Sequence, residues 1–263
     1  MVILKIGGGH HINLEGIADD LQTFPPPYII VHGANALRDE LAARLGIEKH
    51  ILTSVSGYSS VYSDANALDV LMMAYAGLRN KRLVELCQQR GINAIGLTGL
   101  DGRLIQGRRN RGIRIQDGDK IRIVRDFSGK PRQVNTALLR HLLQEGYVPV
   151  LTVPILDETG TAINSENDDI VTLLQGAMGA TRVIHFIEAP GLLADPHRPE
   201  SVIPRLGWEE LARWEARAEG RMKRKLRALL QLKQQQVEQV ILADGRVKHP
   251  LKEALNENGT VIQ

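Results

Sequence analysis

The sequence predicts an α/β protein of three layers, with a mostly parallel β-sheet covered by helices on both faces. Apolar runs typical of strands alternate with amphipathic helical patterns along the whole chain. The first of these runs, residues 2–6, passes directly into three glycines, as a buried parallel strand does before a ligand-binding loop. With 263 residues, 43% of them hydrophobic, the chain can bury the core of one large domain or of two fused lobes.

The expected elements follow one another in regular order. Strands are predicted at residues 2–6, 28–31, 94–97, 147–152, 182–186 and 239–242. Helices are predicted at residues 14–21, 37–44, 65–90, 136–144, 169–178, 208–213 and 221–235. Ligands bind at the carboxyl ends of parallel strands, so the loops after three of these strands should meet at one edge. Those loops are Gly7-Gly8-Gly9, Gly33-Ala34-Asn35 and the segment after Thr98.

Residues 104–125 break the alternation and predict a protruding β-hairpin. Isoleucines alternate there with polar or charged residues, which is the pattern of a half-exposed antiparallel ribbon. Turn sequences stand at residues 117–119 and 128–130. The isoleucines are Ile113, Ile115, Ile121 and Ile123.

The amino-acid composition of the chain indicates which kinds of molecule it could bind. The net charge is only +3, but ten of the basic residues lie between Arg103 and Arg132, so the predicted hairpin is basic. Such a surface suits an acidic partner, although a solvated arginine-rich face would have the same composition. Aromatic residues make up only 4% of the chain, which disfavours nucleic-acid binding. The single Cys87 excludes an internal disulfide framework and suits a small buried residue.

Localisation is expected to be cytoplasmic, with no membrane association. No apolar run approaches the length of a membrane span, and no secretory leader precedes the first strand.

Lys5 stands inside the first apolar strand, just before the glycines. A buried lysine must pair with an acid or serve a ligand, because an isolated buried ammonium is too unfavourable. Glycine amides can approach an anion closely, so a phosphate site is one interpretation. An ordinary strand-to-helix turn with a lysine that reaches solvent is the other.

Two further segments could complete such a site. Asn164 and Asp168 open a predicted helix, where they could cap it or hold a substrate and orient lysines. Lys225 lies on a basic helix and could be a second phosphate lysine or part of a solvated face. The sequence has no Walker motif, no nucleophile–base grouping and no histidine spacing suited to a metal site. Phosphate binding would therefore rest on glycine loops and separate lysines.

Taken together, these motifs resemble the amino acid kinase family, in its acetylglutamate kinase branch. The resemblance spans nearly the whole chain. The motifs, in family order, are Lys5-Ile6-Gly7-Gly8, Val31-His32-Gly33, Gly77-Leu78-Arg79-Asn80-Lys81, Asn93-Ala94-Ile95-Gly96-Leu97, Gly146-Tyr147-Val148-Pro149-Val150, Ala162-Ile163-Asn164 with Asp168, Pro190-Gly191-Leu192-Leu193, Gly220 with Met222 and Lys225, and Gly259-Thr260-Val261.

The resemblance implies phosphoryl transfer from ATP, accompanied by Mg²⁺, to a side-chain carboxylate. It implies catalytic roles for Lys5, Asp168 and Lys225. It also implies two lobes, with residues 1–178 binding the acceptor and forming a homodimer through the helix at 65–90, and residues 179–263 binding ATP. The implied ligands are Gly7, Gly8 and Gly33 for phosphate, and Ala34, Asn35, Val61 and Asn164 for the acceptor.

Within the branch, the chain is most similar to kinases that act on 2-aminoadipate attached to an acidic amino-group carrier protein, LysW, in lysine biosynthesis. The loop at residues 97–103, the basic hairpin and residues 220–225 carry that similarity. It implies that Arg108, Arg109 and Arg111 dock the carrier.

The chain also departs from the family pattern. Val61 aligns with the arginine that clamps the acceptor, Ala34 replaces a glycine, and Ile187-Glu188 replaces a more polar pair. Two other interpretations therefore stand beside the first: an acetylglutamate kinase of arginine biosynthesis, and a catalytically weak paralogue that binds the carrier or nucleotide.

Overall fold

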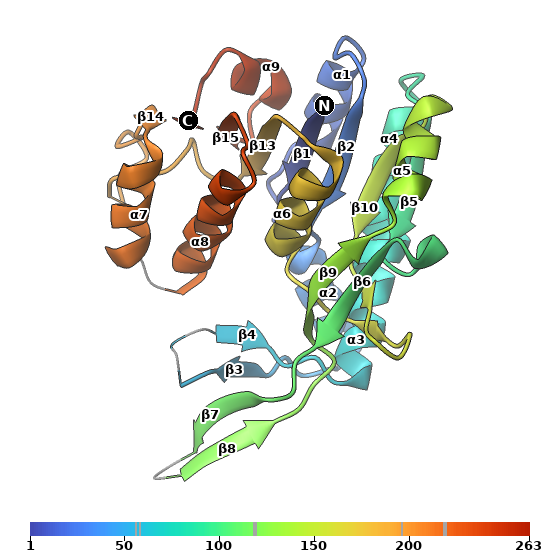
Figure 1. The fold of residues 1–263 in the computed structure, drawn as a ribbon, viewed down its shortest axis with the longest axis vertical. Coiled ribbons are helices and arrows are strands. Elements are labelled where there is room, and N and C mark those ends of the chain that lie inside the picture. The colour runs from blue at the N-terminus through green and yellow to red at the C-terminus, as the bar shows by residue number, and fades with distance from the viewer. Residues whose placement is uncertain (56, 58, 118–119, 196, 218–219) are drawn as a thin grey trace.

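The computed structural model describes residues 1–263 except 56, 58, 118–119, 196 and 218–219, and it leaves out the side chains of residues 59–60, 117 and 220–225. Its centre is an eight-stranded sheet in the order β14-β16-β15-β13-β1-β2-β10-β5 (Figure 1). The strands are β1 (Val2–Ile6), β2 (Tyr28–His32), β5 (Ala94–Thr98), β10 (Val148–Thr152), β13 (Arg182–Ile187), β14 (Arg205–Leu206), β15 (Gln239–Asp244) and β16 (Thr260–Ile262). All neighbours pair in parallel except β15 and β16. The predicted parallel sheet is confirmed.

Helices cover both faces of this sheet, so the three-layer prediction is also confirmed. Successive side chains of a strand point to opposite faces, and Ile3 and Leu4 accordingly belong to different apolar cores. One core lies under α1 (Leu14–Leu21), α4 (Asn80–Gln88) and α9 (Pro250–Leu255). The other lies under α3 (Ala65–Met72), α5 (Thr136–Gln144), α6 (Asn167–Met178), α7 (Trp208–Arg217) and α8 (Gly220–Gln234), with α2 (Asn35–Arg44) packed at its margin.

The long helix predicted at residues 65–90 is helical but not uniform. A π-helical segment, η1 (Met73–Arg79), separates α3 from α4. Tyr75 still belongs to the core under α3, whereas Leu83 belongs to the core on the opposite face. The π-helical segment therefore passes from one face of the sheet to the other, and such segments are frequent at functional sites.

Two hairpins project from one end of the molecule (Figure 1). One is β7 (Ile113–Asp117) with β8 (Lys120–Val124), carried on the ladder of β6 (Ile105–Arg109) with β9 (Gly129–Val134). The other, β3 (Ile51–Thr53) with β4 (Ser59–Val61), was not predicted. A bridge between Ser54 and Ile115 joins the two hairpins. The turn predicted at 117–119 falls largely outside the described residues.

Register divides the four isoleucines of the β7–β8 hairpin between its two faces. Ile123 pairs with Arg114 and Ile121 with Gln116, so these two isoleucines face away from Ile113 and Ile115. They are 67% and 50% exposed. The antiparallel pairing of the two strands agrees with the prediction, but the isoleucines of β7 and those of β8 lie on opposite faces of the hairpin.

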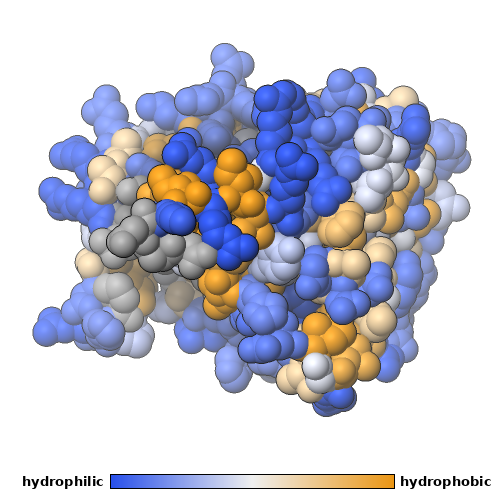
Figure 2. Space-filling view, turned by 90° about the horizontal axis from the view of Figure 1, so that it is seen from below, coloured by the Kyte–Doolittle hydropathy of each residue, from blue (hydrophilic) through white to orange (hydrophobic). Residues whose placement is uncertain are grey.

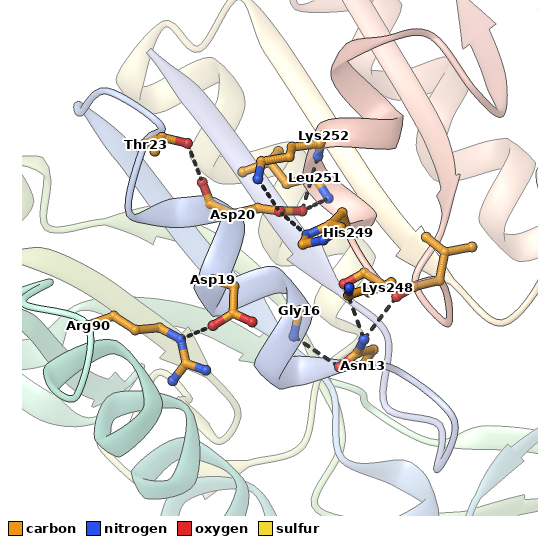
Figure 3. Close-up of polar contacts among 11 residues, drawn as sticks. Asn13, Gly16, Asp19, Asp20, Thr23, Arg90, Lys248, His249, Leu251 and Lys252 are labelled. Carbon is orange, nitrogen blue, oxygen red and sulfur yellow. Dashed lines mark hydrogen bonds and ion pairs between the residues drawn. The ribbon is translucent and has the colours of Figure 1, made fainter.

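The C-terminal part of the chain is fixed to the first helix by a buried carboxylate. Asp20 of α1 accepts hydrogen bonds from the amides of Leu251 (2.9 Å) and Lys252 (3.1 Å) at the start of α9 (Figure 3). Nδ1 of His249 lies 2.9 Å from the same carboxylate. A carboxylate at a helix N-terminus satisfies otherwise unpaired amides and interacts favourably with the helix dipole.

Several short elements escaped prediction. They are α9, β14, β16, β11 (Ile155–Leu156) and β12 (Ala162–Ile163). Segments of two to six residues show too little periodicity, and tertiary pairing stabilises them. Within the described residues, no helix is both long and apolar enough to cross a membrane.

Candidate active site

The two predicted glycine loops meet at the carboxyl edge of β1 and β2. A Cβ atom on Gly8 would lie 2.2 Å from Oδ1 of Asn35 and 2.7 Å from the amide nitrogen of Ala34. A Cβ atom on Gly33 would lie 3.0 Å from the amide nitrogen of Gly8. Only glycine allows the loops to approach this closely. The predicted convergence is confirmed for these two of the three loops.

The amides of this edge are not equivalent. The Gly7 amide donates to Phe186 O (2.9 Å) and the Gly33 amide to Ile6 O (2.9 Å), so both serve the sheet. These two glycines therefore contribute space rather than the free amide donors that the resemblance implied. The Gly8 amide, by contrast, has no acceptor within the described part of the chain.

Ala34 and Asn35 begin helix α2 beside Gly8. Ala34 is the N-cap residue, with φ of −151°, so the replacement of glycine by alanine needs no left-handed backbone here. Its side chain is fully buried. Helix N-termini present unpaired amides and a partial positive charge, which suits an anion beside Gly8.

Lys5 extends from β1 to the first turn of α6. Its Nζ lies 3.3 Å from Oδ1 of Asp168, and only 8% of the lysine is exposed. His185 pairs with Lys5 in the β1–β13 register, is 1% exposed, and places Nδ1 3.8 Å from the same carboxylate oxygen. The structure thus joins two of the three predicted catalytic residues and adds an imidazole. The third, Lys225, belongs to α8, but its side chain lies outside the described residues.

A buried imidazole supports the second glycine loop. Nε2 of His32 accepts from Nδ2 of Asn80 (3.1 Å), so its Nδ1 carries the proton that it donates to Gly33 O (3.3 Å). Burial lowers the pKa of His32 to about 3, although its bond to Gly33 acts in the opposite direction. The nearby charges of Arg79, Lys5 and Lys81 lower this pKa further. His32 is therefore neutral at physiological pH.

Asn164 and Val61 lie around the root of the two hairpins. The side-chain amide of Asn164 donates to Oγ of Ser63 (3.1 Å), two residues beyond Val61. Buried Asp126 accepts from the Ser63 amide (3.2 Å) and from Ser128. Two of the four predicted acceptor residues, Asn164 and Val61, thus lie near Ser63, whereas Ala34 and Asn35 lie beside Gly8. Val61 itself lines a small cavity against α2 and α3, together with Arg38 and Tyr62.

The three predicted docking arginines differ in their environment. Arg108 and Arg111 are exposed. Arg109, in contrast, donates through Nε to Asp126 O (2.8 Å) and stacks 4.1 Å above the ring centre of Phe127. Arg109 therefore also stabilises the hairpin root.

The arrangement suits the oxygens of a phosphate chain. No group of three or more histidine, cysteine, aspartate or glutamate side chains in the described part of the chain could hold a metal ion. Paired lysine and aspartate, glycines that leave room for a ligand, and a helix N-terminus together suit a phosphate chain. Magnesium usually binds such sites through the phosphates it accompanies.

Sequence reasoning missed several residues of this edge. His185 looked like part of an apolar strand, and only the strand register places it beside Lys5. Asp126 stood among basic residues with no motif around it. Glu188 was noticed only as a departure from the family pattern, yet it contacts the first glycine loop.

Comparisons with known proteins find relatives along the whole chain. The profile of the amino acid kinase family matches residues 1–244. A [LysW]-aminoadipate kinase from Thermus thermophilus is 39% identical, over 100% of both chains. One from Deinococcus radiodurans is 34% identical, over 100% of this chain and 91% of that one. An acetylglutamate kinase from Methanopyrus kandleri is 32% identical over 80% of both chains.

The fold also matches solved structures. An N-acetylglutamate synthase from Neisseria gonorrhoeae, complexed with coenzyme A and N-acetyl-glutamate, superposes with a TM-score of 0.80 at 19% identity. The match covers 99% of this chain and 58% of that one. At this identity the likeness concerns the fold alone.

Proposed function

Because the chain belongs to the amino acid kinase family, we propose that it transfers the γ-phosphoryl group of ATP to a side-chain carboxylate. The acceptor we propose is 2-aminoadipate attached to the carrier protein LysW, as in lysine biosynthesis. The observation that carries the proposal is the ion pair of Lys5 and Asp168 beside the meeting point of the glycine loops.

Each residue has a role in this reaction. Lys5 neutralises the oxygens of the transferring group, Lys225 does so from α8, and Asp168 holds the lysines in place. The Gly8 amide and the N-terminus of α2 add donors. ATP with Mg²⁺ supplies the phosphoryl group and shields its charge. The acceptor oxygen bonds to phosphorus as the bond to ADP breaks, giving an acyl phosphate. Positioning and electrostatics are the main requirements of such a transfer.

The projecting hairpins favour an acceptor attached to a protein. Ile51, Val55, Ile121 and Ile123 are 48–67% exposed there, and Figure 2 shows apolar side chains among hydrophilic ones at this end of the molecule. Exposed Arg108 and Arg111 belong to the same region of the chain. An apolar patch beside positive charges suits an acidic carrier, whose approach they would steer. A small free substrate needs no such surface.

The remaining assignments rest on the family. Residues 1–178 would bind the acceptor and residues 179–263 the nucleotide. The exposed apolar side chains of Met73 (50%) and Leu78 (47%) on the long helical segment support a homodimer through that segment. The location we propose for the enzyme is the cytoplasm.

A panel of acceptors tests the proposal. ATP consumption should be fastest with carrier-linked 2-aminoadipate, slower with carrier-linked glutamate, and slow with free N-acetylglutamate. Preference for the free substrate would instead support an acetylglutamate kinase. Absence of turnover with all three would support the weak paralogue, which Val61 in place of the acceptor arginine favours.

A further inference from the structure

Two charged side chains hold the first glycine loop, residues 7–11, from different elements. Nη2 of Arg79, the last residue of η1, lies 3.5 Å from the carbonyl oxygens of both Gly7 and Gly9. Oε1 of Glu188, just after β13, accepts from the amide of His11 at 2.7 Å. The loop thus has a guanidinium at its carbonyls and a carboxylate at its far end.

Arg79 depends on the loop for its hydrogen bonds. Its Nε is buried and has no acceptor among the described residues. No carboxylate in that part of the chain lies within 4 Å of its guanidinium. Arg79 is half-buried, and a guanidinium partly removed from water is stabilised by acceptors. The carbonyls of Gly7 and Gly9 are therefore its main acceptors, and they lie at the outer limit of hydrogen-bond distance.

Glu188 depends on the absence of a side chain at Gly9. A Cβ atom on Gly9 would lie 1.9 Å from Oε2 and 2.0 Å from Cδ of Glu188. The carboxylate therefore packs directly against the backbone of the loop. Because Glu188 follows β13, this contact joins the nucleotide-side segment to the loop that begins at Lys5.

Gly8, the residue between these contacts, has one bond to the second loop. Its carbonyl accepts from the Ala36 amide at 3.0 Å, and its own amide has no acceptor within the described residues. The direction of that amide is therefore fixed by how the flanking peptides are held. Displacing reacting groups by about 1 Å can lower a rate about a hundredfold.

We propose that Arg79 and Glu188 are positioning residues for phosphoryl transfer. Together they form a clamp, the Arg79–Glu188 clamp, that fixes residues 7–11 so that the Gly8 amide faces the phosphoryl group. The inference rests on the proposed function, because it places nucleotide phosphate at this loop.

Nucleotide binding measured by calorimetry tests the clamp. The probe is the non-hydrolysable analogue AMP-PNP with Mg²⁺, and the variants are Arg79→Met, Arg79→Lys, Glu188→Ala and Glu188→Gln. Arg90→Met is the control, since it removes a guanidinium just beyond the end of α4, where Arg90 pairs with Asp19. We expect Kd to rise about tenfold or more for Arg79→Met and Glu188→Ala. Lysine and glutamine should restore part of the affinity, because each keeps a polar group for the loop.

The outcomes separate the clamp from the proposed function. If the wild type binds AMP-PNP and both Arg79→Met and Glu188→Ala bind it with the same Kd, the clamp alone is overturned. The clamp is also overturned if these variants have a lower Tm but the Kd and kcat/KM of the wild type. Failure of the wild type to bind AMP-PNP would overturn the proposed function and the clamp with it. If Arg79→Met does not fold, Arg79→Lys and Glu188→Ala provide the test. An unchanged Kd for AMP-PNP in these two variants contradicts the clamp, and a raised Kd supports it.

Discussion

The Lys5 ammonium lies 3.3 Å from the Asp168 carboxylate, and this pair joins the first strand of the sheet to the first turn of α6. Lys5 is 8% exposed, so the pair is largely shielded from solvent. Electrostatic groups in such surroundings act more strongly on a transferring charge than they do in water.

Replacing Lys5 should remove much of that stabilisation. We expect Lys5→Met to lower kcat about 100- to 1,000-fold, and Asp168→Asn to lower it less, because asparagine keeps the shape but not the charge. The Kd for AMP-PNP should change less than kcat. Turnover of both variants within twofold of the wild type would remove Lys5 and Asp168 from the mechanism.

Gly8→Ala should disturb the contact between the two glycine loops. The added Cβ would lie 2.7 Å from a backbone nitrogen, which cannot rotate away. We expect kcat/KM to fall about 100-fold, because the loop must shift. Gly207→Ala is the matched control, since its Cβ would meet no atom within 4 Å. Equal activity of the two variants would show that the loops need not touch.

Val61→Arg should strengthen binding of the acceptor carboxylate. An arginine can bind a carboxylate through two charge-assisted hydrogen bonds, which valine cannot. We expect kcat/KM for carrier-linked 2-aminoadipate to rise about tenfold. Leu52→Arg adds the same charge to the same hairpin but on its opposite face, because Leu52 is next to the register partner of Val61, and it serves as the control. An equal effect of both substitutions would mean that Val61 does not face the acceptor.

Charge reversal on the hairpin should slow docking of the carrier. Arg108→Glu with Arg111→Glu should lower kcat/KM for the carrier-linked acceptor about tenfold or more at low salt, and less at high salt. KM for ATP should not change. Arg140→Glu, an exposed position on α5, is the control. If the wild type, the Arg108→Glu, Arg111→Glu double variant and Arg140→Glu all bind the carrier with the same affinity, this docking surface is excluded.

His32 should make folding stability depend on pH. Its pKa is lowered to about 3 in the folded protein, against about 6.5 when unfolded. Between these values the unfolded chain binds one more proton, so stability falls as pH decreases below 6.5. At pH 5, this difference in the pKa of His32 lowers the free energy of unfolding by about 2 kcal/mol.

Urea denaturation at pH 7 and pH 5 measures that loss. His32→Gln should show a pH dependence smaller by that amount, because glutamine does not titrate. An identical pH dependence in both proteins would mean that His32 takes up a proton in the folded state.

Periodicity predicted the regular elements well, and β1, α1 and α5 have the predicted bounds. It could not find the β3–β4 hairpin, because those strands have three residues each and a bridge from Ser54 to Ile115 supports them. Lys5 and Asp168 were predicted as a pair from the family pattern. His185 was not, since only pairing of β1 with β13 brings it to Lys5. Nor could the sequence show that Gly7 and Gly33 use their amides within the sheet.

The bond formed in the reaction tests the central claim most directly. The protein is mixed with Mg²⁺, carrier-linked 2-aminoadipate and ATP labelled in the γ-phosphoryl group, and the product is treated with hydroxylamine. We predict label on the carrier, which hydroxylamine releases as it leaves a hydroxamate on the aminoadipate side chain; Lys5→Met should form almost none. Label found only in ATP and inorganic phosphate, with no hydroxamate on the carrier, would contradict the claim.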